Sequence, residues 1–277
     1  MKIALCISGQ MRNFRGNFSR FYRTVIEPTD PDIFIDTWSD AGSSTVNRDQ
    51  DAAEYADCLI SKETLEEYYH PVCVRVEDFK DTYLDKLDGV ALPSELKHFV
   101  PRSKGTLPMY YKMYRCDMLR QEYEQKHGFK YDLIIRARAD MFLDEVLDLE
   151  KLKKHNAVYR VKPGGYEVYP SFVWDVFFIG NSEVMSNVCG AWESLESYWR
   201  EARLIWEARK FDEGGFDYWK VWKGSYLLSN HVNRLGLRVE TMNCSYQLED
   251  KYRVESFNNN FIRKVCRRLK KWCLMCR

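Results

Sequence analysis

The first forty residues contain two short apolar runs separated by an amphipathic segment, and this order limits the possible folds more than any other feature. The runs IALCI (3–7) and DIFIDTW (32–38) each have the length of a buried strand. Between them, apolar residues at helical spacing predict a helix that ends at Pro28. Its apolar face comprises Phe18, Phe21, Tyr22, Val25 and Ile26. Strand, helix and strand in this order predict a parallel pair joined by a crossover.

The same alternation continues through the first half of the chain. We expect a helix over 61–70 that begins at Ser61, a strand in VCVRVEDF (72–79), a helix over 108–127 between Pro108 and Gly128, and a central strand in YDLIIRARAD (131–140). The apolar stripe expected on the helix 108–127 comprises Tyr111, Met113 or Tyr114, Met118 and Tyr123. Residues 80–107 have no clear pattern, and we expect a surface excursion there.

The second half has a mixed pattern. Strands are expected in AVYRVKP (157–163), YEVYPSFVWDVFFIG (166–180) and LRVETMNCSYQL (237–248), and helices over 182–209 and 224–235. The chain has no internal repeat and no linker rich in Pro, Gly or Ser, which favours one continuous domain. The predicted fold class is therefore α/β, with a Rossmann-like, mixed, mostly parallel central sheet flanked by helices.

Length and charge exclude several classes of protein. A chain of 277 residues suits one large domain with a sizeable core, and its formal net charge of +1 predicts no nucleic-acid binding. No apolar run approaches the roughly 18 residues of a membrane span. The start of the chain reads as a strand rather than a signal peptide, and the nine cysteines are scattered. Free thiols and a cytoplasmic location are expected.

Residues 261–277 form a distinct basic tail. The sequence FIRKVCRRLKKWCLMCR carries seven Lys or Arg and no acidic residue, and its apolar residues can form one helical stripe. Such a basic amphipathic helix favours peripheral contact with an anionic membrane surface. A solvated terminal helix is the alternative. Cys273 and Cys276 form a lone CxxC pair, which is weak support for a zinc site.

Polar residues follow three of the predicted strands. In open α/β sheets, ligands bind beyond the carboxyl ends of the strands. These ends present Ser8, Gly9, Gln10 and Arg12 after the first strand, Asp36, Thr37 and Trp38 in the second, and Arg136, Arg138 and Asp140 in the central strand. Gly9 permits close approach of the backbone to a ligand, and Arg12 can pair with a phosphate. The turn is neither GxGxxG nor a Walker loop, which argues against a dinucleotide dehydrogenase and a P-loop NTPase.

The end of the central strand has an unusual charge pattern. Because strand side chains alternate, Arg136, Arg138 and Asp140 are predicted to share one face over roughly 13 Å. A carboxylate at such a strand end can hold Mg²⁺ or Mn²⁺, which would bridge a diphosphate and neutralise it as it leaves. Asp140 is therefore the metal candidate. The alternative is a local ladder of Arg–Asp ion pairs without a metal.

Four segments in this order resemble a known group of enzymes: MKIALCISGQMRNF, DIFIDTW, the Tyr-Lys helix YYKMYRCDMLRQEYE and YDLIIRARADMF. The set is similar to GT-A-type glycosyltransferases known from bacterial surface-polysaccharide loci and from large DNA viruses of algae, over roughly residues 1–240. The resemblance implies a GT-A-like domain over 1–260, with a nucleotide-sugar-binding half (1–140) and an acceptor-binding half (141–260). It also implies a nucleotide-sugar donor, preferably a UDP-sugar, a glycan acceptor and Mn²⁺ or Mg²⁺ at Asp140.

The resemblance also assigns site residues. It places Ser8, Gly9, Gln10, Arg12, Thr37, Trp38, Lys112, Arg136 and Arg138 at the nucleotide sugar. The acid of WDVFFIGNSEVM, Asp175, is the catalytic candidate beside the acceptor: it would remove the acceptor proton in an inverting enzyme or shield the reacting centre in a retaining one. An ordinary strand-end carboxylate is the alternative. Trp38, Trp174 and Tyr110 are candidates for lining the sugar pockets.

The chain departs from the group at two places. Only Asp140 occupies the metal motif, so metal dependence would be weak or would use a partner such as His231. Where the group often has a Glu before a Leu-Leu pair, this chain has Ser225 and Tyr226. FDEGGFDYW (211–219) offers Asp212, Glu213 and Asp217 as substitutes, although an acidic surface loop is the simpler interpretation.

Two other functions remain open. A nucleotidyltransferase or nucleotide-sugar pyrophosphorylase would share the sheet and the metal carboxylate, but the Gly-rich first loop with a following Lys is missing. The other alternative is a carbohydrate-binding protein that has lost catalysis, which the single carboxylate and the missing Glu would allow.

Overall fold

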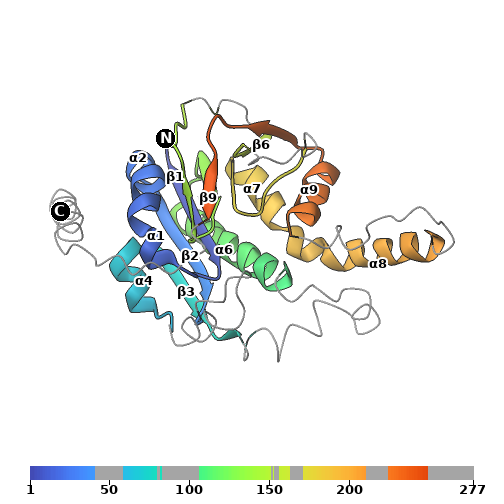
Figure 1. The fold of residues 1–277 in the computed structure, drawn as a ribbon, viewed down its shortest axis with the longest axis horizontal. Helices are drawn as coiled ribbons and strands as arrows, with labels where there is room; N and C mark the ends of the chain where they lie inside the picture. Colours follow the sequence, from blue (N-terminus) through green and yellow to red (C-terminus); the bar gives the residue numbers. More distant parts are fainter. Residues whose placement is uncertain are drawn as a thin grey trace.

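A seven-stranded sheet runs through the centre of the molecule in the computed structural model (Figure 1). The structure describes residues 1–40, 59–79, 82, 106–150, 152, 156–162, 171–209 and 224–248. The basic tail, the acidic segment 211–219 and nearly all of 80–107 therefore lie outside the described residues.

The strand order of the sheet is β3-β2-β1-β4-β7-β6-β8. The strands are β1 (Ile3–Gly9), β2 (Asp32–Trp38), β3 (Cys73–Glu77), β4 (Leu133–Ala137), β6 (Ala157–Arg160), β7 (Phe177–Gly180) and β8 (Arg238–Thr241). The four strands from β3 to β4 are mutually parallel, and β7 runs antiparallel to both of its neighbours. The expected α/β class with a mixed, mostly parallel sheet is confirmed.

Helices cover both faces of this sheet. They are α1 (Phe14–Phe21), the π-helical stretch η1 (Tyr22–Ile26), α2 (Glu27–Thr29), α4 (Lys62–Tyr69), α6 (Thr106–His127), α7 (Ser182–Cys189), α8 (Ala191–Arg209) and α9 (Gly224–Arg234). Odd positions of β1, such as Leu5, pack with α1, η1 and α4, whereas even positions, such as Cys6, pack with α6, α7 and α9. Figure 1 shows α1, α2 and α4 grouped apart from α7, α8 and α9. The period of two in the strands thus builds two separate cores.

Several expected boundaries are corrected. Pro28 lies inside α2, and the chain leaves the helix only at Asp30, which has φ 41°. The helix expected over 182–209 breaks into α7 and α8 at Gly190, where an added Cβ would lie 3.1 Å from the Ser186 carbonyl oxygen. Of the strand expected over 166–180, the residues Phe177–Gly180 form β7, and residues 171–176 are not in a strand. Residues 163–170 lie outside the described part. The segment 237–248 forms β8 and also β9 (Tyr246–Leu248), which pairs with β5 (Met141–Leu143) in a small second sheet.

The buried face of α6 differs from the expected apolar stripe, because it carries four charged side chains. These are Lys112, Asp117, Arg120 and Glu124, all at most 2% exposed. Met118 and Tyr114 are only half-buried. Apolar periodicity cannot reveal such a face, because the charges are buried only through pairing with one another and with groups far away in the chain.

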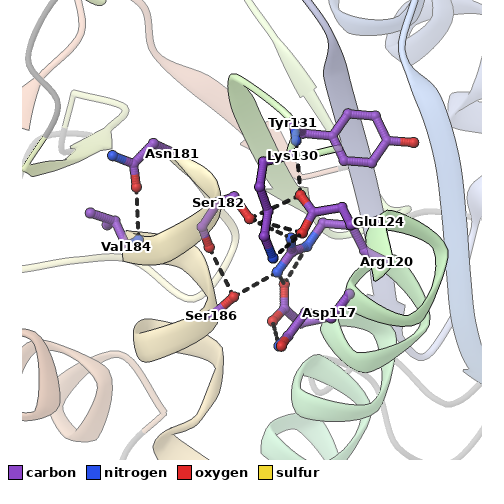
Figure 2. A network of polar contacts seen from close by, with 10 residues as sticks. Asp117, Arg120, Glu124, Lys130, Tyr131, Asn181, Ser182, Val184 and Ser186 are labelled. Carbon is purple, nitrogen blue, oxygen red and sulfur yellow. Dashed lines mark hydrogen bonds and ion pairs between the residues drawn. The ribbon is translucent and has the colours of Figure 1, made fainter. Parts of the chain in front are cut away.

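Three of these charges fasten α6 to α7 (Figure 2). Arg120 is bound by Asp117 and Glu124 at 2.8 Å each, and it donates to Ser182 Oγ at 2.8 Å and Ser186 Oγ at 2.7 Å. Glu124 also accepts from the backbone N–H of Tyr131 at 2.8 Å. Burial raises the pKa of Glu124, but Lys130, the Tyr131 amide and Arg120 outweigh it and lower the pKa overall. The network lies at the amino end of β4, opposite the edge where ligands are expected.

We expect Arg120→Ala to lower the free energy of unfolding by about 3–5 kcal/mol, because it removes the cation of the buried Asp117 and leaves the buried Glu124 with Lys130 alone. Urea denaturation measures the effect. Arg200→Ala is the matched control: Arg200 forms an i,i+4 pair with Glu196 at 2.6 Å, but both side chains are more than half exposed. Its loss should cost at most about 1 kcal/mol. Equal losses for the two variants would contradict a structural role for the buried network.

Candidate functional site

The strand order reverses between β1 and β4. From β1 the chain crosses to β2 on one side, and β4 lies on the other side, so the carboxyl ends of β1 and β4 flank a topological switch point. A pocket of about 260 Å³ opens there. Eight of the eleven predicted site residues line it: Ser8, Gly9, Gln10, Arg12, Trp38, Arg136, Arg138 and Asp175. Residues more than 160 positions apart in the sequence thus meet in one cavity.

The turn after β1 has a backbone that few residues tolerate. Gly9 has φ 101°, a conformation that favours glycine, and Arg12 has φ 43°. The chain then enters α1, whose Asn17 Nδ2 donates to the carbonyl oxygens of Ala139 at 2.9 Å and Met141 at 2.5 Å. The turn after β1 and the turn after β4 are therefore fastened to each other.

The central strand ends earlier than expected. β4 stops at Ala137, so Arg138 and Asp140 lie in a turn, and the predicted strict alternation fails beyond Ala137. Arg136 keeps the predicted face, opposite Cys6 of β1. The backbone N–H of Arg138 still donates to the Val176 carbonyl at 3.0 Å, which keeps the turn beside the strand β7.

Asp140 is buried behind the pocket and holds two arginines. Its Oδ1 accepts from Arg138 Nε at 2.9 Å, and its Oδ2 accepts from Arg138 Nη2 at 2.5 Å and Arg12 Nη1 at 3.0 Å. The carboxylate is 1% exposed. Burial raises its pKa, but the charges of Arg138 and Arg12 outweigh this and lower the pKa overall. Asp140 is therefore held in its ionised form.

Arg136 lies on the pocket wall with a different set of contacts. The residue is 1% exposed, its Nε lies 3.3 Å from Ser8 Oγ and its Nη2 lies 3.4 Å from the Ser8 carbonyl oxygen. Its Nη1 has no hydrogen-bond partner among the described residues. Burial lowers the pKa of Arg136, and Asp175 opposes that effect. A guanidinium remains protonated in proteins, so a positive charge with one unused donor lies in a residue of the pocket wall.

Asp175 enters the pocket from the segment before β7. Its carboxylate accepts a hydrogen bond from Ser225 Oγ, and its backbone N–H donates to the same oxygen at 3.3 Å. Ser225 therefore orients this acid. The hydroxyl of Tyr110 donates to the Gly224 carbonyl at 2.7 Å, and burial, followed by Asp175, raises the pKa of Tyr110.

Thr37 and Lys112 are buried beside the pocket and, within the described part of the chain, do not line it. Thr37 Oγ1 donates to the Gly9 carbonyl at 2.7 Å, which fixes the turn after β1. Lys112 Nζ lies 2.6 Å from Asp36 and 2.5 Å from Glu77, under the ring of Trp38 at 4.0 Å from its centroid. A nucleotide contact for either residue stays a prediction.

Among the described residues, the other aromatic candidates and the metal candidate His231 do not line this pocket. Tyr110 is fully buried, and Trp174 packs edge-on against Phe172. Both ring nitrogens of His231 have partners, the Tyr198 hydroxyl at 2.6 Å and the Asn187 carbonyl at 2.9 Å. Across the described residues, no group of three or more His, Cys, Asp or Glu side chains has the arrangement of a metal site.

The donor set does not fit the expected Mn²⁺ or Mg²⁺. Both oxygens of Asp140 already accept from arginines, and Arg12, Arg136 and Arg138 would repel a divalent cation placed beside them. Hard cations need several oxygen ligands, whereas this end of β4 presents guanidinium groups. The metal role of Asp140 therefore stays a prediction, and the observed contacts argue against it.

Sequence reasoning missed the pocket residues contributed by the starts of two helices. Thr106, Pro108 and Met109 come from the first turn of α6, and Gly224 is the first residue of α9. A Cβ added at Gly224 would lie 3.0 Å from Met109 Cε and 3.6 Å from Asp175 Cγ. The predicted helix starts could have pointed to these residues, because helix N-termini favour anions. Nothing in the sequence, however, indicated which helix starts lie at the carboxyl ends of β1 and β4.

A comparison with known protein-family models gives no match, and a search of curated proteins gives no significant match. Among the helices that the structure describes, none is long and apolar enough to cross a membrane.

Asp36 provides a pH-dependent test of the buried charges beside the pocket. Burial raises its pKa to about 6 despite the opposing charge of Lys112. Between about pH 4 and pH 6 the folded state then binds more protons than the unfolded state, so this carboxyl destabilises the fold as the pH rises through that window. The stability of Asp36→Asn relative to wild type should therefore rise by up to about 3 kcal/mol from pH 4 to pH 7, in addition to a pH-independent cost of removing one partner of Lys112.

Urea denaturation at several pH values measures this difference. Asp30→Asn, at an exposed aspartate, is the control and should show a nearly flat difference. A flat difference for Asp36→Asn as well would mean that Asp36 titrates like an exposed aspartate.

Proposed function

We propose that this protein is a glycosyltransferase with a GT-A-like domain. It transfers a sugar from a nucleoside diphosphate sugar, preferably a UDP-sugar, to a hydroxyl of a glycan acceptor. The observation that carries the proposal is one pocket, at the switch point of the sheet, which three arginines and one half-buried carboxylate line together. The strand order β3-β2-β1-β4 and the strand β7, antiparallel to both of its neighbours, agree with the mixed, mostly parallel sheet that the sequence predicts.

The arginines suit the donor. Guanidinium groups form charge-assisted, often bidentate hydrogen bonds with phosphate oxygens, and Gly9 lets the backbone of the turn after β1 approach them closely. Trp38, whose ring packs on Tyr111 and Phe79, offers the pocket a rigid apolar wall. This combination favours a ligand with both a diphosphate and flat or apolar faces.

Asp175 suits the acceptor side of the reaction. In the transfer, the bond between the sugar C1 and the phosphate oxygen breaks with its electron pair going to that oxygen, and C1 bonds to the acceptor oxygen. In an inverting reaction the acceptor hydroxyl loses its proton to Asp175, which Ser225 holds in orientation. In a retaining reaction the same carboxylate would face the positive charge that develops at C1. No step of this proposal passes through a metal ion.

The cytoplasmic location and the membrane contact of residues 261–277 remain part of the proposal, since they concern residues or conditions outside the described structure. Liposome binding of the full chain and of a chain ending at residue 260 would test the membrane contact, and equal binding would contradict it.

Asp175→Asn should lower kcat by about 10²–10⁴-fold, because a neutral amide cannot accept the proton or face a positive centre, while donor affinity changes little. Transfer is measured as nucleoside diphosphate released from UDP-, GDP- and dTDP-sugars in the presence of glycan acceptors. Glu122→Gln, at an exposed carboxylate of α6, is the control and should keep full activity. Release of pyrophosphate instead of nucleoside diphosphate would contradict glycosyl transfer and favour a nucleotidyltransferase.

A further inference from the structure

The charges around the pocket do not balance. Among the described residues, the side chains that line the pocket include three positive charges, Arg12, Arg136 and Arg138, and one negative charge, Asp175. Asp140, which pairs with Arg12 and Arg138, adds a second negative charge. A neighbouring group of charges is neutral as a whole. In it, Lys112 pairs with Asp36 and Glu77, and Arg75 lies 3.7 Å from Asp36. One positive charge at the pocket is therefore left without a counter-ion in the described structure.

That excess has a definite location. Arg136 is almost completely buried, its two contacts to Ser8 are long, and among the described residues its Nη1 has no partner. A buried charged donor that lacks a partner costs free energy, and natural structures rarely retain one without a use. Because Arg136 lines the pocket, an anion in the pocket is the partner that would satisfy it.

Asp140 gives the other two arginines fixed positions. A single carboxylate binds Arg138 through two nitrogens and Arg12 through a third, so it holds two like charges side by side against their repulsion. Both arginines still line the pocket, and Arg12 Nε has no partner in the described part of the chain. Both oxygens of the carboxylate thus accept hydrogen bonds from guanidinium groups.

From these contacts we infer that the diphosphate of the donor is bound and neutralised by Arg136, together with Arg12 and Arg138, without a divalent cation. Asp140 is then a positioning residue for two arginines and not a metal ligand. The inference rests on the proposed function for the identity of the donor, but the anion site itself does not. As the bond to C1 breaks, the leaving nucleoside diphosphate gains one negative charge, and the guanidinium groups compensate it as a metal ion would do elsewhere.

The first experiment measures binding of inorganic pyrophosphate, UDP and uridine to the full chain by calorimetry, in EDTA and in Mn²⁺. We expect pyrophosphate and UDP to bind in EDTA and uridine to bind much more weakly. We expect Arg136→Met to weaken pyrophosphate and UDP at least about tenfold. The unliganded variant should unfold at the same or a higher temperature, because an unsatisfied buried charge is replaced by an apolar side chain of similar length.

Two further variants separate binding from folding. Arg23→Met removes the same charge from an exposed position and should change neither ligand affinity nor stability. Arg136→Lys should restore part of the pyrophosphate affinity, since it returns the charge without the planar fork. Asp140→Asn should weaken pyrophosphate and UDP in EDTA while uridine binding stays unchanged, which a general loss of structure would not produce.

The outcomes distinguish the two proposals. Pyrophosphate binding in EDTA that Arg136→Met abolishes supports the arginine site, even if no nucleotide sugar binds and the glycosyltransferase proposal fails. Binding of UDP and UDP-sugars only with Mn²⁺, with this dependence lost in Asp140→Asn, overturns the inference and leaves the glycosyltransferase proposal intact. If neither pyrophosphate nor any nucleoside diphosphate binds under either condition, both proposals are wrong.

Discussion

The carboxylate of Asp140 joins the two turns on which the pocket depends. One turn follows β1 and carries Arg12, and the other follows β4 and carries Arg138. Strand pairing places Ser8, Gly9 and Arg136 at the pocket, but the pairing of β1 with β4 ends at Ala137, before Arg138. Beyond that point Asp140 and Asn17, which donates to the carbonyl oxygens of Ala139 and Met141, add to the backbone bond from Arg138 to Val176. The sheet and these side chains therefore fix the shape of this edge together.

Buried charge helps to attach α6, the longest helix among the described residues, to the rest of the fold. On the same face as the apolar contacts, α6 places Lys112 near one end of the sheet and Arg120 near the other, and each is held by two carboxylates. Such pairs add little net stability over apolar packing, but an alternative position of the helix would leave a charge buried and unpaired. The start of α6, which contributes to the pocket wall, is therefore held in one register relative to β2.

The sequence was sufficient for the frame of the site and insufficient for its internal contacts. Apolar runs and helix starts predicted β1, β2, β4 and the helices around them, and the rule that ligands bind beyond carboxyl ends brought Ser8, Arg12 and Arg136 together correctly. The alternation that placed Asp140 on the same face failed because the strand gives way to a turn, and nothing in an Ala-spaced charge pattern reveals where pairing stops. The buried charges of α6 were missed for a related reason. The partners of Lys112 lie 35 and 76 positions away, and Arg120 reaches Ser182 62 positions away. The pairs of Arg120 with Asp117 and Glu124 have the local spacing that is also common on exposed helix faces.

Two buried arginines, Arg120 of α6 and Arg136 of β4, show how a structural arginine differs from one that is available to a ligand. Arg120 lies at the amino end of β4 and is bound by two carboxylates and two serine hydroxyls. Arg136 lies at the carboxyl end of β4, and within the described structure its hydrogen bonds are long contacts to Ser8, beside the ring of Phe178 at 5.8 Å from its centroid. Both lose the same hydration on burial, so the difference lies in what replaces the water. For Arg120 the protein replaces it completely, which is the behaviour of a structural residue. For Arg136, a residue of the pocket wall, the replacement is incomplete at Nη1, and an anionic ligand is the group that would complete it.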